Sequence, residues 1–331
     1  MTVPYTSLVA TLSFTGFIRA MLIWRGSVWK LVWSELFIWS LLFALFSLIY
    51  RLALNDSQQT SFEKFCVYCY MHADMIPFEF ILGYYITLIV SRWSKFWINL
   101  GFLDNICLTT IVHLRHGDIE RAQLYRRNIV RMILLYQIMV YRIICPGVRK
   151  MYPTLESLVE AGITYIHLKF FLGYINESEI EHFAENKFWM PIKWCMYLIR
   201  DARKEGLIIN DFGVQQIYEY VIAFRENVIH LWLSDWVPVP LAYTQIAFTS
   251  IRIYFLVLIF GRQFLQTGSS LVQAQIDVYV PFITIIQFIT YVGWCKLGET
   301  LVNPFGSDDD DFDYKFVMNR NLNVLIFLNI F

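Results

Sequence analysis

Residues 76–93 read Ile76-Pro-Phe-Glu-Phe-Ile-Leu-Gly-Tyr-Tyr-Ile-Thr-Leu-Ile-Val-Ser-Arg-Trp93, a stretch that is apolar enough to enter a bilayer. At roughly 100° per residue, one narrow stripe of a helix would carry Ile76, Phe80, Tyr84 and Thr87. A stripe of bulky apolar side chains can pack against a neighbouring helix, or it can line a narrow hydrophobic passage. Helix packing is the commoner role, so the rest of the chain has to decide between the two.

The composition of the 331 residues is typical of a membrane protein, with 57% hydrophobic, 18% aromatic and 16% charged residues. Soluble domains average about 45–50% apolar and about 25% charged residues. The 27 basic and 27 acidic residues balance, so total charge indicates nothing about partners. The first residues lack a basic segment followed by a cleavable apolar core, and we expect an internal span to drive insertion.

Four segments are predicted to cross the membrane, at about residues 32–50, 75–90, 236–260 and 276–295. A helix needs about 20 mainly apolar residues to cross a bilayer, which makes the second segment short. Glu35 is the only charge in the first segment, Glu79 lies in the second, and Arg252 is the only charge in the third. Residues 51–74 are polar and are predicted to be an outside loop, with a glycosylation sequon at Asn55.

Basic residues are concentrated after the second segment, which favours the cytoplasmic side for residues 92–235 and for both termini. This region is predicted to form helices. Residues 128–145 are apolar but contain Arg131 and Arg142, which fits a buried helix better than another span. The sequon at Asn176 would face the cytoplasm and is attributed to chance. The chain 1–331 is therefore predicted to be a single all-α membrane domain.

Motifs of known enzyme sites are not found in this sequence, whether nucleotide-binding loops, nucleophile motifs or zinc-binding His patterns. Cys66 and Cys69 form a CxxC pattern without the strand and helix of a redox motif. They can be a disulfide or redox pair, or scattered thiols of a membrane protein. Nothing here indicates an enzyme.

An acidic run follows the fourth predicted span, within residues 299–313. Asn303-Pro-Phe-Gly306 predicts a compact turn, and four aspartates follow at 308–311. Such a run is usually a solvated acidic loop. Turn carbonyls beside several carboxylates can also supply the six to eight oxygen ligands that calcium prefers. The run could then tie the membrane part to the cytoplasmic part.

Blocks of sequence along nearly the whole chain carry a resemblance to one family. The most specific block is Asn303-Pro-Phe-Gly306 followed by Asp308–Asp311. The other blocks, in chain order, are Tyr5-Thr-Ser7, Trp24-Arg-Gly-Ser27, Ile49-Tyr-Arg-Leu-Ala-Leu54, Ile76-Pro77, Leu82-Gly83, Arg92-Trp93, Pro240-Leu241, Tyr243-Thr-Gln245, Gly261-Arg-Gln-Phe264 and Tyr291-Val-Gly-Trp294. With these blocks the chain resembles the bestrophins, which are calcium-activated chloride channels of animal membranes.

The resemblance implies a homopentamer in the plasma membrane, with four membrane helices in each subunit and one central pore for chloride and other small anions. It places the pore neck at Ile76, Phe80 and Tyr84, and a cytoplasmic aperture near Phe212. Tyr84 replaces the Phe that is commoner in relatives, and Glu79 replaces a small polar residue. A carboxylate beside an anion path is awkward unless it points into the protein.

The resemblance also implies a calcium ion, held by the backbone carbonyls of Ala10, Thr300 and Asn303 and by the side chains of Asp308 and Asp311. We expect no nucleic-acid partner. Two alternative functions are an anion transporter and a membrane scaffold or regulator of other channels. A transporter would be expected to contain internal repeats, and none is visible in the sequence.

Overall fold

The computed structural model describes residues 14–153, 188–265, 280–306 and 308–327. In these ranges the regular elements are helices, with one isolated bridge between Leu114 and Ile208. Contacts between Cα atoms divide the chain into two units. The first contains Met1–Trp93, Pro238–Pro304 and Asp308–Asp310, and the second contains Ser94–Val237, Phe305–Ser307 and Asp311–Phe331.

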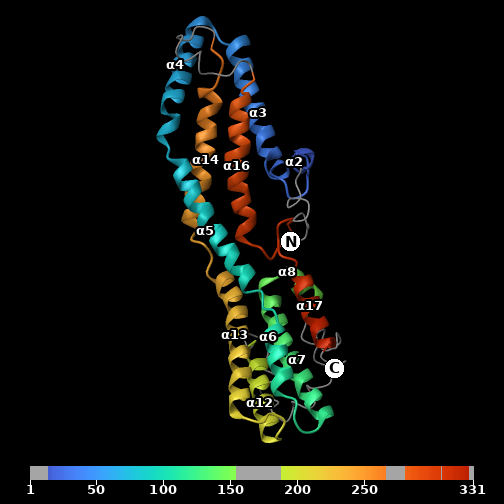
Figure 1. Ribbon diagram of the computed structural model, residues 1–331. Coiled ribbons are helices and arrows are strands. Elements are labelled where there is room, and N and C mark those ends of the chain that lie inside the picture. The colour runs from blue at the N-terminus through green and yellow to red at the C-terminus, as the bar shows by residue number, and fades with distance from the viewer. Residues whose placement is uncertain (1–13, 154–187, 266–279, 307, 328–331) are drawn as a thin grey trace. The chain divides into compact units, whose positions relative to one another are not determined.

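Long helices make up the first unit (Figure 1). Ser27 caps α3 (Val28–Leu52), because its Oγ accepts a hydrogen bond from the Lys30 backbone N–H at 3.3 Å. α3, α14 (Leu241–Gly261) and α16 (Phe282–Val302) pack side by side, and α4 (Asp56–His72) packs on α14. The short helix α2 (Phe14–Met21) precedes α3.

Aromatic side chains fill the centre of this unit. Trp39 of α3 donates its indole N–H to the Phe255 carbonyl oxygen of α14 at 2.8 Å. Phe255 in turn contacts Phe288 of α16, with 4.7 Å between the ring centroids. A buried indole N–H without a hydrogen-bond partner would destabilise the fold. The hydrogen bond to Phe255 supplies that partner and also fixes the orientation of the Trp39 ring.

The predicted loop at residues 51–74 is wrong, because most of it is the helix α4. The Asn55 backbone N–H donates to Gln58 Oε1 at 3.2 Å, which is one half of a helix-capping arrangement. The helix lies close to α14, where a Cβ on Gly261 would stand 3.1 Å from the Tyr70 backbone nitrogen. Hydropathy decided the prediction, and a polar helix does not stand out by hydropathy.

The CxxC pattern lies within α4. Cys66 and Cys69 are both free thiols, and both are buried. The structure therefore supports scattered thiols rather than a disulfide at this place.

Two helices of the described residues, α3 and α14, are long and apolar enough to cross a membrane. The 3₁₀-helix η1 (Ala73–Met75) joins α4 to α5 (Phe78–Ile98), and this pair, bent by 43°, is a third candidate if it counts as one span. The helix α16 stands where the fourth span was predicted, but it carries Lys296 and Glu299 and is not among these candidates. Residues 276–279 of that prediction lie outside the described residues.

The start of the third predicted span needs a correction. Trp236 is the last residue of α13 (Asp211–Trp236) and not the first of a span. Pro238 and Pro240 separate it from Leu241, where α14 begins. Proline lacks a backbone N–H and disfavours helical backbone in the residue before it, so two prolines break the chain into two helices.

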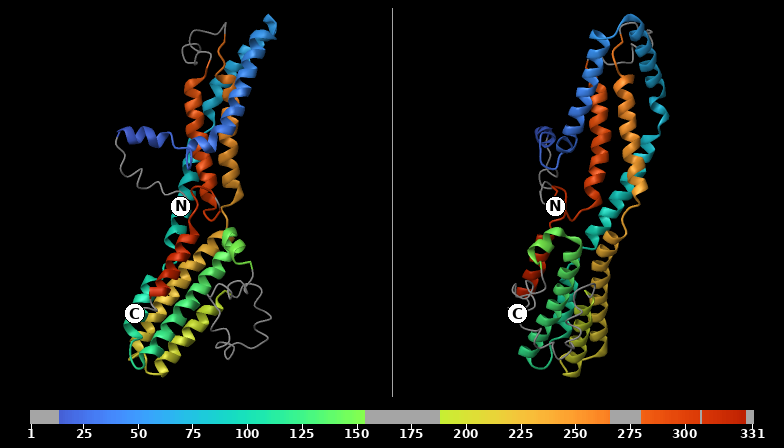
Figure 2. Two further views of the ribbon diagram at one scale, coloured as in Figure 1. Left: turned by 90° about the vertical axis from the view of Figure 1, so that its right-hand side faces the viewer. Right: turned by 180° about the vertical axis from the view of Figure 1, so that it is seen from behind.

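The second unit contains α6 (Asp104–His113), α7 (Ile119–Ile144), α8 (Pro146–Met151), α12 (Met190–Lys204), α13 and α17 (Tyr314–Phe327). α7 packs against each of the other five (Figure 2). Ile129, Ile133 and Val140 on α7 are fully buried. The prediction of a buried helix over residues 128–145 is therefore confirmed.

A buried polar network ties α17 to the rest of the second unit. Gly101 has a left-handed backbone (φ +77°), and a Cβ there would stand 2.7 Å from Val228, so only glycine fits. Its carbonyl oxygen accepts hydrogen bonds from Gln137 Nε2 at 2.9 Å and from Asn321 Nδ2 at 3.0 Å. Asn321 Nδ2 also donates to Gln137 Oε1 at 2.9 Å, and both amide side chains are fully buried.

Replacing Asn321 by Ala is expected to destabilise this unit by about 1–3 kcal/mol, because Gln137 loses a partner inside the core. At about 2–4 °C per kcal/mol, the midpoint of thermal unfolding in detergent should fall by several degrees. Asn319→Ala is the matched control, because Asn319 lies on the same helix and is exposed. Equal midpoints for the two variants would contradict a stabilising role for the network.

Candidate functional site

One face of α5 is buried and the opposite face is not. Leu82, Tyr85 and Ile89 belong to the core of the first unit. Phe80 and Tyr84, one helical turn apart, are instead 79% and 53% exposed in the single chain. An exposed row of aromatic side chains on an apolar helix indicates contact with something outside the chain: lipid, another subunit or a passage.

Ile76, the first residue of the predicted stripe, does not lie on this helix. Ile76 comes before α5 and has an extended backbone (φ −87°, ψ 113°). Its side chain is partly buried and packs against the core of the first unit. The helical stripe is therefore wrong at Ile76, because the chain turns from η1 into α5 at Ile76 and Pro77. A role for Ile76 in a pore neck stays a prediction.

Small groups lie along the same face. A Cβ added to Gly83 would meet no atom within 4 Å, so open space surrounds this glycine in the single chain. The Thr87 hydroxyl donates to the Gly83 carbonyl oxygen at 2.8 Å, which satisfies the hydroxyl within the helix. The exposed face therefore carries the two bulky rings of Phe80 and Tyr84, and the hydroxyl of Thr87 already has a hydrogen-bond partner within the helix.

Glu79 turns toward another helix. Its Oε1 accepts a hydrogen bond at 2.7 Å from the Tyr291 hydroxyl of α16. The sequence alone left the direction of this carboxylate open, and the structure directs it to α16.

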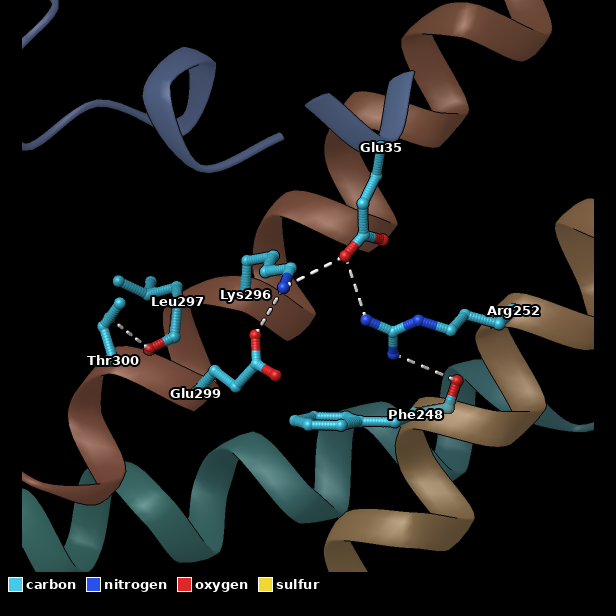
Figure 3. Close-up of polar contacts among 7 residues, drawn as sticks. All are labelled: Glu35, Phe248, Arg252, Lys296, Leu297, Glu299 and Thr300. Atoms are coloured by element: carbon cyan, nitrogen blue, oxygen red, sulfur yellow. Dashed lines mark hydrogen bonds and ion pairs between the residues drawn. The ribbon is translucent and has the colours of Figure 1, made fainter. Parts of the chain in front are cut away.

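Four charged side chains meet between α3, α14 and α16 in the first unit, and we name Glu35, Arg252, Lys296 and Glu299 the charge quartet (Figure 3). Glu35 Oε1 lies 3.0 Å from Arg252 Nη2 and 3.0 Å from Lys296 Nζ. Lys296 Nζ also lies 2.7 Å from Glu299 Oε2. Two acids and two bases balance, which removes the cost of leaving a charge unpaired among apolar helices.

Arg252 makes two further contacts with its own helix. Its Nη1 donates to the Phe248 carbonyl oxygen at 3.5 Å, and its guanidinium carbon lies 5.3 Å from the centre of the Phe248 ring. Sequence reasoning noted Glu35 and Arg252 as the only charges of their spans but did not pair them. The opposite charges of Glu35 and Arg252 could have predicted this ion pair.

The acidic run begins with residues of the first unit. Asp309 Oδ2 accepts hydrogen bonds from Lys30 Nζ at 2.6 Å and from the Gly26 backbone N–H at 3.0 Å. The hydrogen bond from Lys30 is the main reason that the pKa of Asp309 lies below its usual range, and the Gly26 N–H adds to it. Gly26 has a left-handed backbone (φ +65°) that favours glycine at this place. Asp309 thus fixes the start of α3.

The predicted calcium ligands are placed as follows. Thr300 lies in the last turn of α16, where helix carbonyls lack partners within the helix, and Asn303 follows directly. Asp308 is exposed, whereas Asp311 is buried. Ala10 lies outside the described residues.

Within the described ranges, no group of three or more His, Cys, Asp or Glu side chains is placed to hold a metal ion. The predicted site uses only two carboxylates, and its other ligands are backbone carbonyls. Carbonyl and carboxylate oxygens are ligands that suit calcium. A helix C-terminus also carries partial negative charge, which favours a cation near Thr300.

Phe212 belongs to the second unit, in the first turn of α13, and is 68% exposed. Asn210 caps this helix by accepting a hydrogen bond from the Gly213 N–H at 2.9 Å. Gly213 packs against His113, because a Cβ there would stand 2.9 Å from its Nδ1. This leaves Phe212 on the outer side of the turn. Its role in an aperture stays a prediction.

The sequence profile of one protein family, described as "Bestrophin, RFP-TM, chloride channel", matches residues 1–328. The chain belongs to the bestrophin family. The resemblance is thereby confirmed, and so is the prediction of an all-α membrane protein.

Individual bestrophins are similar over almost the whole chain. Bestrophin homolog 24 of Caenorhabditis elegans is 37% identical over 99% of this chain, and bestrophin-3 of Homo sapiens is 38% identical over 98%. The chain spans 51% and 48% of the length of these two relatives. A crystal structure of a bacterial bestrophin homolog from Klebsiella pneumoniae is 16% identical, with a TM-score of 0.62 over 93% of this chain and 100% of that one.

Proposed function

We propose that this bestrophin chain forms an anion channel that conducts chloride and is activated by calcium. The observation that carries the proposal is the exposed face of α5, where Phe80 and Tyr84 point away from the core of their own unit. The family described as chloride channels supports the same conclusion. We further propose a homopentamer in the plasma membrane, with both termini in the cytoplasm.

In a ring of subunits, the α5 faces would surround a narrow apolar passage. Water leaves a hydrophobic constriction readily, and a dry constriction stops ions. Widening the passage by a small helix movement would let water and anions enter. The N-terminal end of α5 and the positive edges of the Phe80 rings would favour anions over cations.

Calcium would act through the run at residues 308–311 together with the carbonyls of Ala10, Thr300 and Asn303. A bound ion can shift a closed–open equilibrium only by its difference in affinity for the two states. Apart from Ala10, the proposed ligands lie in the last turn of α16 or in the segment that follows it, so a preference of calcium for one position of α16 would reach the membrane helices directly.

The decisive experiment is single-channel recording from the purified chain in a planar bilayer, with calcium varied on one side. We expect unitary chloride currents whose open probability rises with calcium. A membrane scaffold or a regulator of other channels gives no current under these conditions. Electrically silent uptake of chloride into vesicles would favour a transporter.

Four single variants test the calcium site: Asp308→Asn, Asp309→Asn, Asp310→Asn and Asp311→Asn. We expect the first and last to raise the half-activating calcium concentration by about tenfold or more, because each removes a charged ligand. Asp310→Asn should change it little. Asp309 pairs with Lys30, so Lys30→Gln is the control for the loss of that ion pair at the start of α3.

Calcium dose–response curves at two salt concentrations provide the measurement. A solvated acidic run that attracts calcium by net charge alone predicts four equal shifts that fade as ionic strength rises. Four indistinguishable curves would therefore refute specific ligands at Asp308 and Asp311.

A further inference from the structure

Glu79 is the only acidic side chain of α5, and it stands beside the exposed face that carries Phe80 and Tyr84. Neighbouring residues of a helix point about 100° apart, so the carboxylate flanks this face instead of lying on it. Glu79 is itself exposed. A flexible side chain in this position can turn toward the exposed face or away from it.

Tyr291 holds the Glu79 side chain away from the exposed face by a hydrogen bond. Its hydroxyl donates to Glu79 Oε1 at 2.7 Å, within the usual range for a hydrogen bond to a charged acceptor. Its ring meets the Phe78 ring edge-on, with 5.0 Å between centroids, and Phe78 is buried in the core of the first unit. The ring is thus held by a fixed neighbour, and its hydroxyl holds the carboxylate on the α16 side of α5.

We infer that Tyr291 is a positioning residue for conduction: it holds the Glu79 carboxylate off the exposed face of α5. This inference rests on the proposed channel function. A fixed negative charge inside a narrow passage of low dielectric constant repels anions strongly. Held by Tyr291, the charge is displaced from the passage. Released, the same side chain can reach the face on which Phe80 and Tyr84 stand.

Tyr291→Phe keeps the ring and removes only the hydroxyl. We expect it to lower single-channel chloride conductance by about threefold at low ionic strength, because the freed carboxylate moves toward the anion path. The loss should shrink as salt is raised, since salt screens the charge. Glu79→Gln alone should conduct about as well as the unmodified chain.

The double variant Tyr291→Phe/Glu79→Gln is the decisive arm. Without a carboxylate at position 79, loss of the Tyr291 hydroxyl should not lower the conductance, which should equal that of the unmodified chain. A structural defect caused by Tyr291→Phe would persist in the double variant. Equal losses in the single and double variants would therefore overturn the inference, as would an unchanged conductance in Tyr291→Phe.

Tyr254→Phe is the matched control. Tyr254 also contacts the Phe78 ring, at 4.2 Å between centroids, but in the described part of the chain it donates no hydrogen bond to Glu79. Its conductance should not change. An unmodified chain that passes no anion current would overturn the proposed function itself, whereas conduction without rescue in the double variant overturns only the role of Tyr291.

Discussion

The double variant Phe80→Ala/Tyr84→Ala is expected to conduct chloride in the absence of calcium. Both side chains project from the exposed face of α5, so truncating them removes apolar bulk from that face without opening a hole in the core of the first unit. A constriction that closes by dewetting depends on that bulk. Once it is gone, water and anions should pass whether or not calcium is bound.

The measurement is open probability in planar bilayers with calcium chelated. We expect it to rise from near zero to a value close to that of the calcium-activated channel. Phe37→Ala is the control, because Phe37 is a comparably exposed aromatic residue (64%) on α3 rather than α5. Ile76→Ala is measured separately, since Ile76 packs against the core and its truncation tests a different surface.

Full closure of the double variant after calcium removal would place the gate elsewhere on the chain. The exposed Phe212 in the first turn of α13 would then be the next residue to truncate.

The second large effect is expected at the charge quartet. Glu35→Gln removes the carboxylate that Arg252 and Lys296 share, and leaves two cations with one acid, Glu299. An uncompensated charge among membrane helices costs about 2.5–3.5 kcal/mol on insertion scales. We expect the variant to be less stable by about 2 kcal/mol, because the quartet is partly exposed.

A second substitution should reverse most of that loss. Glu35→Gln/Arg252→Met leaves one acid and one base, Glu299 and Lys296, which still pair at 2.7 Å. Thermal unfolding of the purified protein in detergent is the readout. We expect the double variant to be more stable than Glu35→Gln, although it carries one more substitution. If the two losses simply add, the quartet does not act as a balanced group.

Several features of the fold could be predicted because they appear in the sequence as long apolar segments. The apolar runs of α3 and α14 and the buried helix over residues 128–145 are examples. α4 is not such a segment, because many of its residues are polar. Its helix is fixed by the capping hydrogen bond between Asn55 and Gln58 and by its close packing against Gly261 of α14. Ile76 was wrongly assigned to the stripe because the helical spacing was applied to a residue whose backbone is not helical.

Pairings between distant residues could not be predicted from spacing. Glu79 and Tyr291 are 212 positions apart, and Glu35 and Arg252 are 217 apart. A sequence shows that a charge is present in a span, and physical chemistry then requires a partner, but only the packing of helices decides which residue supplies it. The direction of Glu79 is the clearest case, because a carboxylate that faced an anion path would repel anions, whereas one directed to α16 would not.

The charge quartet has one further consequence, which concerns the electric field across a membrane. A group that moves through this field gains or loses energy in proportion to its net charge, about 2.3 kcal/mol per elementary charge per 100 mV. Within α16, Lys296 and Glu299 cancel, and across the quartet Glu35 cancels Arg252. When these helices shift as one body, the quartet itself therefore contributes no net gating charge.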